Sequence, residues 1–89
     1  MKLKYRFVIR EVSGQWVAVA VGQDHGNFNG MVKLNATGAF LMERLAKEDI
    51  SREALLEAML ERYDVTRDRA EENLDSFLTV LREGGLLTE

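Results

Sequence analysis

The most constraining feature of this sequence is a run in which a strand candidate passes into a helix with no linker residue between them. The run is Asn27 to Leu45 and reads NFNGMVKLNATGAFLMERL. It begins with a Gly/Asn-rich turn and continues as a short strand, Met31 to Leu34. Asn35 follows at once, and its side chain can accept from the free N–H groups of a first helical turn. This joint locks the two halves of the chain together.

Two further strand candidates precede the joint. Tyr5 to Val12 alternates between an apolar face and a largely charged one, as a strand with one buried face does. After a tight turn at Ser13-Gly14, Gln15 to Val21 is apolar on both faces. Because both of its faces are apolar, we expect this second strand to be the centre of a hairpin or meander.

A nine-residue connection, Gly22 to Gly30, joins the central strand to the joint. It holds three of the seven glycines, which predicts a long hairpin loop whose glycines serve turn geometry. His25 lies in this loop, and a metal site or an acid/base role would require partner residues. The sequence contains no second His and no Cys, so we interpret His25 as a solvated loop residue.

Three helices are predicted after the third strand. The first runs from the Asn35 cap to about Ala46, and Gly38 lies on its apolar stripe. A close approach of this helix to a strand would explain a residue that costs helix stability. Ser51 begins the second helix and Thr66 caps the third.

The end of the third helix is marked by glycine. Its apolar stripe includes Leu74, Phe77 and Leu78, and it ends at Gly84-Gly85, which we expect to adopt left-handed conformations. Leu86-Leu87 then folds back to cap the core.

Length and composition indicate one small globular domain, residues 1–89. Apolar residues make up 46% and charged residues 30%, and no apolar run approaches the roughly 20 residues of a membrane span. The N-terminal segment alternates apolar and charged residues, so we expect no signal peptide, no membrane partner and a cytoplasmic location. The lack of cysteine excludes disulfides and thiolate chemistry.

Charge is unevenly spread along the chain. Residues 1–42 carry a net charge of +3, and residues 43–89 carry −6. An acidic helical half repels a phosphate backbone, whose attraction to Lys and Arg supplies most non-specific affinity for nucleic acid. Nucleic acid is therefore excluded as the expected partner.

No set of catalytic side chains converges in the sequence. Glu71-Glu72 and Asp75 lie on consecutive turns of the third helix, a pattern that a solvated helix face gives far more often than an acid/base pair or a cation site. The serines have no histidine partner to serve as their base. We therefore predict a chain that is not an enzyme and holds no cofactor or metal.

The order of elements, three strands followed by three helices, predicts an α+β fold with one antiparallel sheet and two edge strands. The third strand, Met31 to Leu34, is an edge flanked directly by a helix. An extended peptide can pair with its N–H and C=O groups while helix side chains supply pockets. Alternatively, the edge is solvated or covered by self-association. The residues alone leave these two interpretations equally open.

Three segments carry a family resemblance: FNGMVKLNATGAFLMERL (Phe28 to Leu45), ERYDV (Glu61 to Val65) and AEENLDSFLTVLREGGLL (Ala70 to Leu87). The most specific parts are LNxTG before the first helix and the terminal GLL. At this spacing the chain resembles the pyrroloquinoline-quinone biosynthesis protein D (PqqD) family over nearly its whole length. The resemblance implies a winged-helix-like fold.

The resemblance also implies a function. Members of the family are recognition elements for ribosomally made, post-translationally modified peptides. They bind the leader segment of a precursor peptide as a strand added to the third β-strand, and they present it to a modifying enzyme, commonly a radical S-adenosylmethionine enzyme. The relatives serve several maturation systems, so the resemblance does not select a pathway.

The family's binding residues map onto a strand and a helix of this chain. Main-chain pairing would fall to Met31, Val32, Lys33 and Leu34, and the helix side of the groove to Leu74, Asp75 and Leu78. Asp75 stands where the family pattern has an apolar residue. It is either a selector for a basic leader residue or an exposed substitution without consequence.

Two alternatives come from other functional classes. A winged-helix DNA-binding protein requires a basic recognition helix, whereas Arg67 to Glu83 has three basic and five acidic residues. An assembly module would dimerise through the strand edge. We expect a monomer or a weak homodimer.

Overall fold

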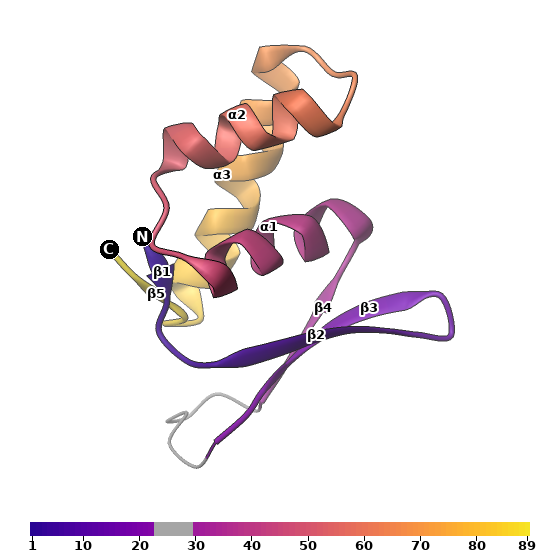
Figure 1. The fold of residues 1–89 in the computed structure, drawn as a ribbon, viewed down its shortest axis with the longest axis vertical. Coiled ribbons are helices and arrows are strands. Elements are labelled where there is room, and N and C mark those ends of the chain that lie inside the picture. The colour runs from indigo at the N-terminus through magenta and orange to yellow at the C-terminus, as the bar shows by residue number, and fades with distance from the viewer. Residues whose placement is uncertain (23–29) are drawn as a thin grey trace.

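Residues 1–22 and 30–89 are described by the computed structural model of the chain (Figure 1). The elements are β1 (Lys2–Leu3), β2 (Phe7–Val12), β3 (Gln15–Ala20), β4 (Met31–Leu34), α1 (Ala36–Lys47), α2 (Arg52–Arg62), α3 (Arg67–Glu83) and β5 (Leu87–Thr88). The predicted α+β class, with a three-stranded antiparallel sheet before three helices, is confirmed. His25, the predicted loop histidine, lies outside the described residues.

The main sheet has the antiparallel order β2-β3-β4, so the predicted central position of β3 is confirmed. Ala18 of β3 is fully buried and pairs with Ile9 of β2 and Val32 of β4. In Figure 1 the helices lie on one side of this sheet. On the opposite side, the side chains of Val12 and Met31 are 57% and 47% exposed.

The joint between β4 and α1 has the predicted cap. Asn35 Oδ1 accepts a hydrogen bond of 2.7 Å from the backbone N–H of Gly38, and α1 begins at Ala36. At Gly38 the helix lies next to the strand, as predicted, but the tightest contact of a Cβ there would be with the capping Asn35 Oδ1, at 3.2 Å. A Cβ at this position would lie 3.4 Å from Leu34 Cδ2 and 3.5 Å from Phe77 Cε1. The start of α1 therefore sits between the edge strand and α3.

The core is made mainly by the helices. Ser51 and Thr66 cap α2 and α3, because each hydroxyl accepts from the backbone N–H three residues later, as the sequence predicted. The largest fully buried side chains are Leu41, Met42, Leu45, Leu55, Leu56, Met59, Leu74, Leu78 and Leu81. Phe7 and Ala18 close this core from the sheet side.

The two ends of the chain depart from the prediction. The first long strand begins at Phe7 rather than Tyr5, because residues 2–4 pair with the C-terminal segment: Lys4 N–H donates to Leu86 O at 2.8 Å. Leu86 folds back and is 3% exposed, as predicted, but β1 and β5 form a small sheet that was not predicted. Two-residue strands are too short to show the alternation that predicts longer ones.

The turn after α3 needs only one left-handed residue. Gly85 has φ +70°, whereas Gly84 has φ −79° and remains helical, so the prediction of left-handed conformations holds for Gly85 alone. This turn lets Leu86 N–H donate to Leu81 O at 2.9 Å.

Replacing the cap of α1 tests how much the joint contributes to stability. Asn35→Ala removes the acceptor for Gly38 N–H and should lower the free energy of unfolding by about 1 kcal/mol, measured by urea denaturation. Asn35→Asp keeps an acceptor and should lose less. Equal losses for the two variants would show that the cap hydrogen bond is not what stabilises the joint.

Candidate functional site

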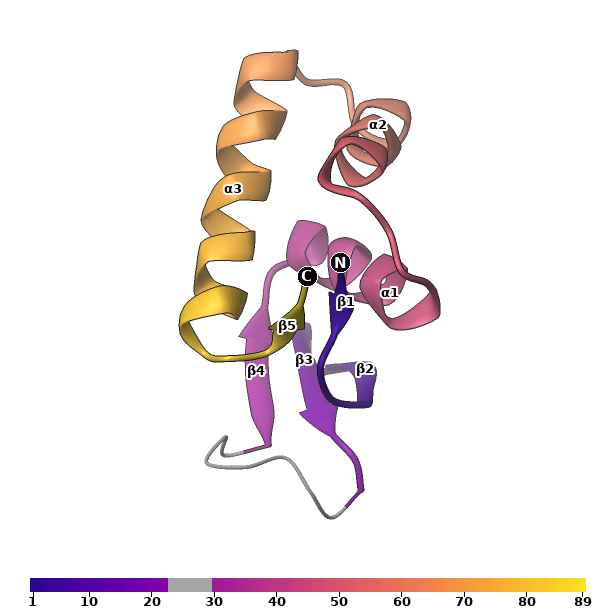
Figure 2. The ribbon, with the colours of Figure 1, turned by 90° about the vertical axis from the view of Figure 1, so that its left-hand side faces the viewer.

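A groove of about 350 Å³ runs between β4 and α3. β4 contributes Val32, Lys33 and Leu34, the cap and first turns of α1 contribute Asn35, Thr37, Gly38 and Leu41, and α3 contributes Asn73, Ser76, Phe77, Val80 and Leu81. Figure 2 shows the C-terminal half of α3 running beside β4. The groove therefore lies along the edge strand that the sequence predicted to be open.

Hydrogen-bond directions in the sheet determine which backbone groups of β4 face this edge. Ala20 N–H donates to Gly30 O at 2.7 Å, so this pair exchanges ladder bonds. In an antiparallel pair every second residue does so, which makes Val32 and Leu34 the next β4 residues bonded to β3. The N–H and C=O of Lys33 point the other way, toward the open edge.

The walls of the groove are largely apolar, and most of the polar residues that line it are uncharged. Phe77 is half-buried, and Val80 is 59% exposed on the groove side of α3. Covering a large apolar side chain that is this exposed on a mainly polar helix surface would be favourable, because it removes apolar surface from water. The carboxamide oxygen of Asn35 is already used to cap α1.

Of the described residues that line the groove, Lys33 alone is charged. Among the described residues it forms no ion pair. The groove thus combines an open strand edge with an apolar wall, and the strand that borders it carries Lys33, whose side chain lies on the opposite face of the sheet.

The residues predicted from the family resemblance fall into two groups in the structure. Val32, Lys33 and Leu34 line the groove, and Met31 begins the same strand. Leu74 and Leu78 do not line it: both are fully buried in the core. The face of α3 that borders the groove is instead the neighbouring one, which carries Asn73, Ser76, Phe77 and Val80.

Asp75 also lies away from the groove. Arg52 of α2 donates to it through two nitrogens, Nε to Oδ1 at 2.8 Å and Nη2 to Oδ2 at 2.9 Å. These hydrogen bonds hold the pKa of the Asp75 carboxyl below its ordinary value of 3.8. The geometry does not favour a role for Asp75 in selecting a basic leader residue. Its carboxylate lies outside the groove and is already paired with Arg52 of α2.

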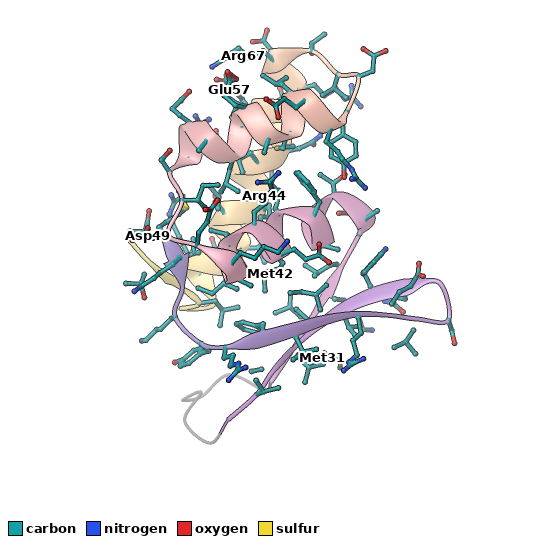
Figure 3. All side chains as sticks on the ribbon, in the orientation of Figure 1. Met31, Met42, Arg44, Asp49, Glu57 and Arg67 are labelled. Carbon is teal, nitrogen blue, oxygen red and sulfur yellow. The ribbon has the colours of Figure 1, made fainter. Side chains whose placement is uncertain are left out.

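A second hollow, of about 520 Å³, lies between residues 2–7 and the end of α1. Its lining is mostly charged and includes Lys2, Lys4, Arg6, Lys47 and Asp49. Asp49, labelled in Figure 3, accepts a hydrogen bond of 2.8 Å from the amino group of Met1, which helps to hold the N-terminal segment. Because it lacks the apolar walls of the β4 groove, we do not take this hollow as the candidate site.

In residues 1–22 and 30–89, no three His, Asp or Glu side chains come together in a way that would hold a metal ion. None of the helices in this part of the chain has the length and apolar character needed to cross a membrane.

Truncating an apolar side chain should cost much more stability on the core face of α3 than on its groove face. Leu78→Ala should lower the free energy of unfolding by about 2–5 kcal/mol, because it leaves a cavity in a fully packed site. Val80→Ala, one helical step away and mostly exposed, should cost at most about 0.5 kcal/mol. Similar losses measured by urea denaturation would contradict this division of the helix.

The pairing of Asp75 with Arg52 makes a prediction about pH. A carboxyl whose pKa is lowered by folding stabilises the fold above its unfolded pKa, and this contribution is lost as pH falls through the folded pKa. In Arg52→Gln the pKa of Asp75 should rise toward 3.8, measured by carboxyl ¹³C NMR. Arg67→Gln is the control, because Arg67 pairs with Glu53, Glu57 and Glu71 instead. An unchanged Asp75 pKa in Arg52→Gln would refute the pairing.

Comparisons with known proteins bear on this site. Residues 15–87 match the model of the family described as coenzyme PQQ synthesis protein D (PqqD). No curated protein sequence matches the chain significantly. Among solved structures, TbiB1 in complex with the TbiA(beta) leader peptide is similar with a TM-score of 0.73 and 23% identity, covering 98% of this chain and 94% of that one.

A second similar structure is lasso peptide synthetase B1 complexed with the leader peptide. Its TM-score is 0.69 and its identity 22%, over 99% of this chain and 96% of that one. At these identities the two structures support the fold. The family model covers both β4 and the groove-bearing half of α3, and it therefore places the whole groove within the matched region. The chain belongs to the PqqD family.

Proposed function

We propose that this chain is a non-enzymatic recognition element that binds the leader segment of a ribosomally made precursor peptide. The observation that carries the proposal is the junction of an open strand edge with an apolar groove, on β4 and α3. The two similar structures, each of a protein complexed with a leader peptide, support the same interpretation.

The leader adds a strand to the sheet beside β4. When the added strand is antiparallel to β4, the residue opposite Lys33 exchanges two main-chain hydrogen bonds with it, which contribute about 1–3 kcal/mol together. A micromolar complex needs about 8 kcal/mol, so the larger share comes from apolar side chains seated against Phe77 and Val80. The strand edge sets the register of the peptide, and the groove supplies most of the affinity.

The bound leader is presented to a separate modifying enzyme. Side chains alternate along a strand, so only half of those on the leader enter the groove and the others remain accessible. The partner that acts on the precursor is a maturation enzyme, commonly a radical S-adenosylmethionine enzyme on the family resemblance. In this role the chain supplies binding and orientation, and the chemistry belongs to the partner.

The charge pattern of α3 disfavours the DNA-binding alternative. Arg67 is within ion-pair distance of Glu53, Glu57 and Glu71, and Arg82 pairs with Glu89 at 2.9 Å. A helix in which two of the three arginines are held by carboxylates, and which also carries five acidic residues, has little to offer a phosphate backbone.

Proline scanning of the two sheet edges tests strand addition. The probe is a peptide enriched by the unmodified chain from a displayed random library. Lys33→Pro removes the N–H that faces the open edge and should weaken binding about three- to tenfold relative to Lys33→Ala, measured by fluorescence anisotropy. Glu11→Pro is the matched control, because the ladder alternation directs its N–H to the opposite edge of the sheet.

NMR mapping gives the proposal a second readout. The peptide should shift the amides of residues 31–34 together with those of Asn73, Phe77 and Val80. A library from which no peptide is enriched, or a bound peptide that leaves residues 31–34 unmoved, would overturn the proposal. Light scattering over a concentration series tests the assembly-module alternative. If the chain dimerises through the β4 edge, its measured molar mass should double.

A further inference from the structure

We infer that the site selects leader segments with the pattern apolar–acidic–apolar, in which the acidic residue lies directly opposite Lys33. This inference rests on the proposed function and names the chemical class of peptide that the groove accepts. It reverses the sign of the charge preference that Asp75 suggested from the sequence.

The alternation of β4 sets the pattern. Val32 and Leu34 pack against the core, whereas the side chain of Lys33 lies between them in sequence and is exposed on the opposite face of the strand. Residues directly opposite one another in neighbouring strands present their side chains to the same face. The peptide residue paired with Lys33 therefore lies beside its ammonium group, and the residues before and after it enter the groove.

The charges around that position are positive. Arg10, Val17 and Lys33 form one row across the three strands, because Val17 pairs with Arg10 on one side and Lys33 on the other. Neither Arg10 nor Lys33 forms an ion pair with a described residue. An acidic side chain on an added strand would extend this row and place its charge next to Lys33.

The adjacent peptide positions need apolar residues for a different reason. They face the wall formed by Leu41, Phe77 and Val80, and Gly38 leaves space at this wall that a Cβ would fill. Among the described residues of the lining only Lys33 is charged, and its side chain lies on the other face of the strand, so a carboxylate or ammonium directed inward would be desolvated without a partner on that wall. Charge is thus accepted at one position and disfavoured at its two neighbours.

The expected preference is modest for one pair and measurable. An opposite-charge cross-strand pair changes affinity by about two- to fivefold, and the effect should shrink at high salt because the pair is solvent-exposed. A displayed library passes through several rounds of enrichment, so a preference of this size becomes a clear bias in composition.

Selection with charge-reversed variants tests the inference. Peptides enriched by the unmodified chain should carry Asp or Glu at one position flanked by apolar residues. Lys33→Glu should convert that position to Lys or Arg. Lys47→Glu, which changes an exposed lysine at the end of α1 outside the groove, should leave the acidic preference intact.

A double-mutant cycle then assigns the effect to the pair. Replacing the acidic peptide residue by its amide should weaken binding about two- to fivefold with the unmodified chain and not at all with Lys33→Gln. Peptides that bind residues 31–34 without an acidic bias, or whose bias survives Lys33→Glu, would overturn the inference while leaving the proposed function intact. A failure to enrich any peptide would overturn both.

Discussion

The direct junction of β4 with α1 is the constraint on which the site depends. Asn35 ends the strand and caps the helix within one residue, so the helix axis is fixed relative to the edge strand. At Gly38 the first turn of α1 lies against Leu34 and Phe77, and a Cβ there would come within 3.2 Å of the capping oxygen of Asn35. Because the strand, the first turn of α1 and α3 meet at this glycine, the groove has a rigid floor rather than one made by a loop.

The faces of α3 make different contacts, so that in the proposed function one helix would serve both stability and recognition. Leu74 and Leu78 fill the core, Asp75 is held by Arg52 of α2, and Phe77 with Val80 borders the groove. The helix is thus held in place on two sides, by packing of its leucines in the core and by the hydrogen bonds between Asp75 and α2. The groove face is therefore presented at a fixed distance from β4, which lowers the entropic cost of binding a peptide.

Much of the fold was predictable from sequence because local signals and tertiary contacts agree. The bounds of β4 and the caps at Asn35, Ser51 and Thr66 followed from residue types alone. The small β1-β5 sheet did not, because its strands are too short to carry a pattern. The strand side of the groove was predicted as well, since an edge position follows from the order of the elements.

The helix side of the groove was harder to predict, for a physical reason. The apolar stripe of α3 contains Leu74, Phe77 and Leu78 together, and periodicity alone does not say which members face the core and which border a groove. Val80 is the residue that could have identified the groove face from sequence. It lies three residues after Phe77 on an otherwise polar surface, so the pair forms a second, narrower apolar stripe. The role of Asp75 could not be predicted without knowing that Arg52 lies next to it, and the two residues come together only when α2 packs on α3.

In the proposed function, an edge strand that accepts a peptide must also avoid pairing with its own copies, and Lys33 would meet both requirements. In a two-fold pairing of two β4 strands centred on this residue, the lysines lie directly opposite each other, which is destabilising. In a pairing centred on Val32, the two lysines remain on the same face within diagonal reach. An acidic peptide residue turns the same position from repulsive to attractive. The charge that favours a leader strand therefore disfavours a second copy of the chain at the same edge.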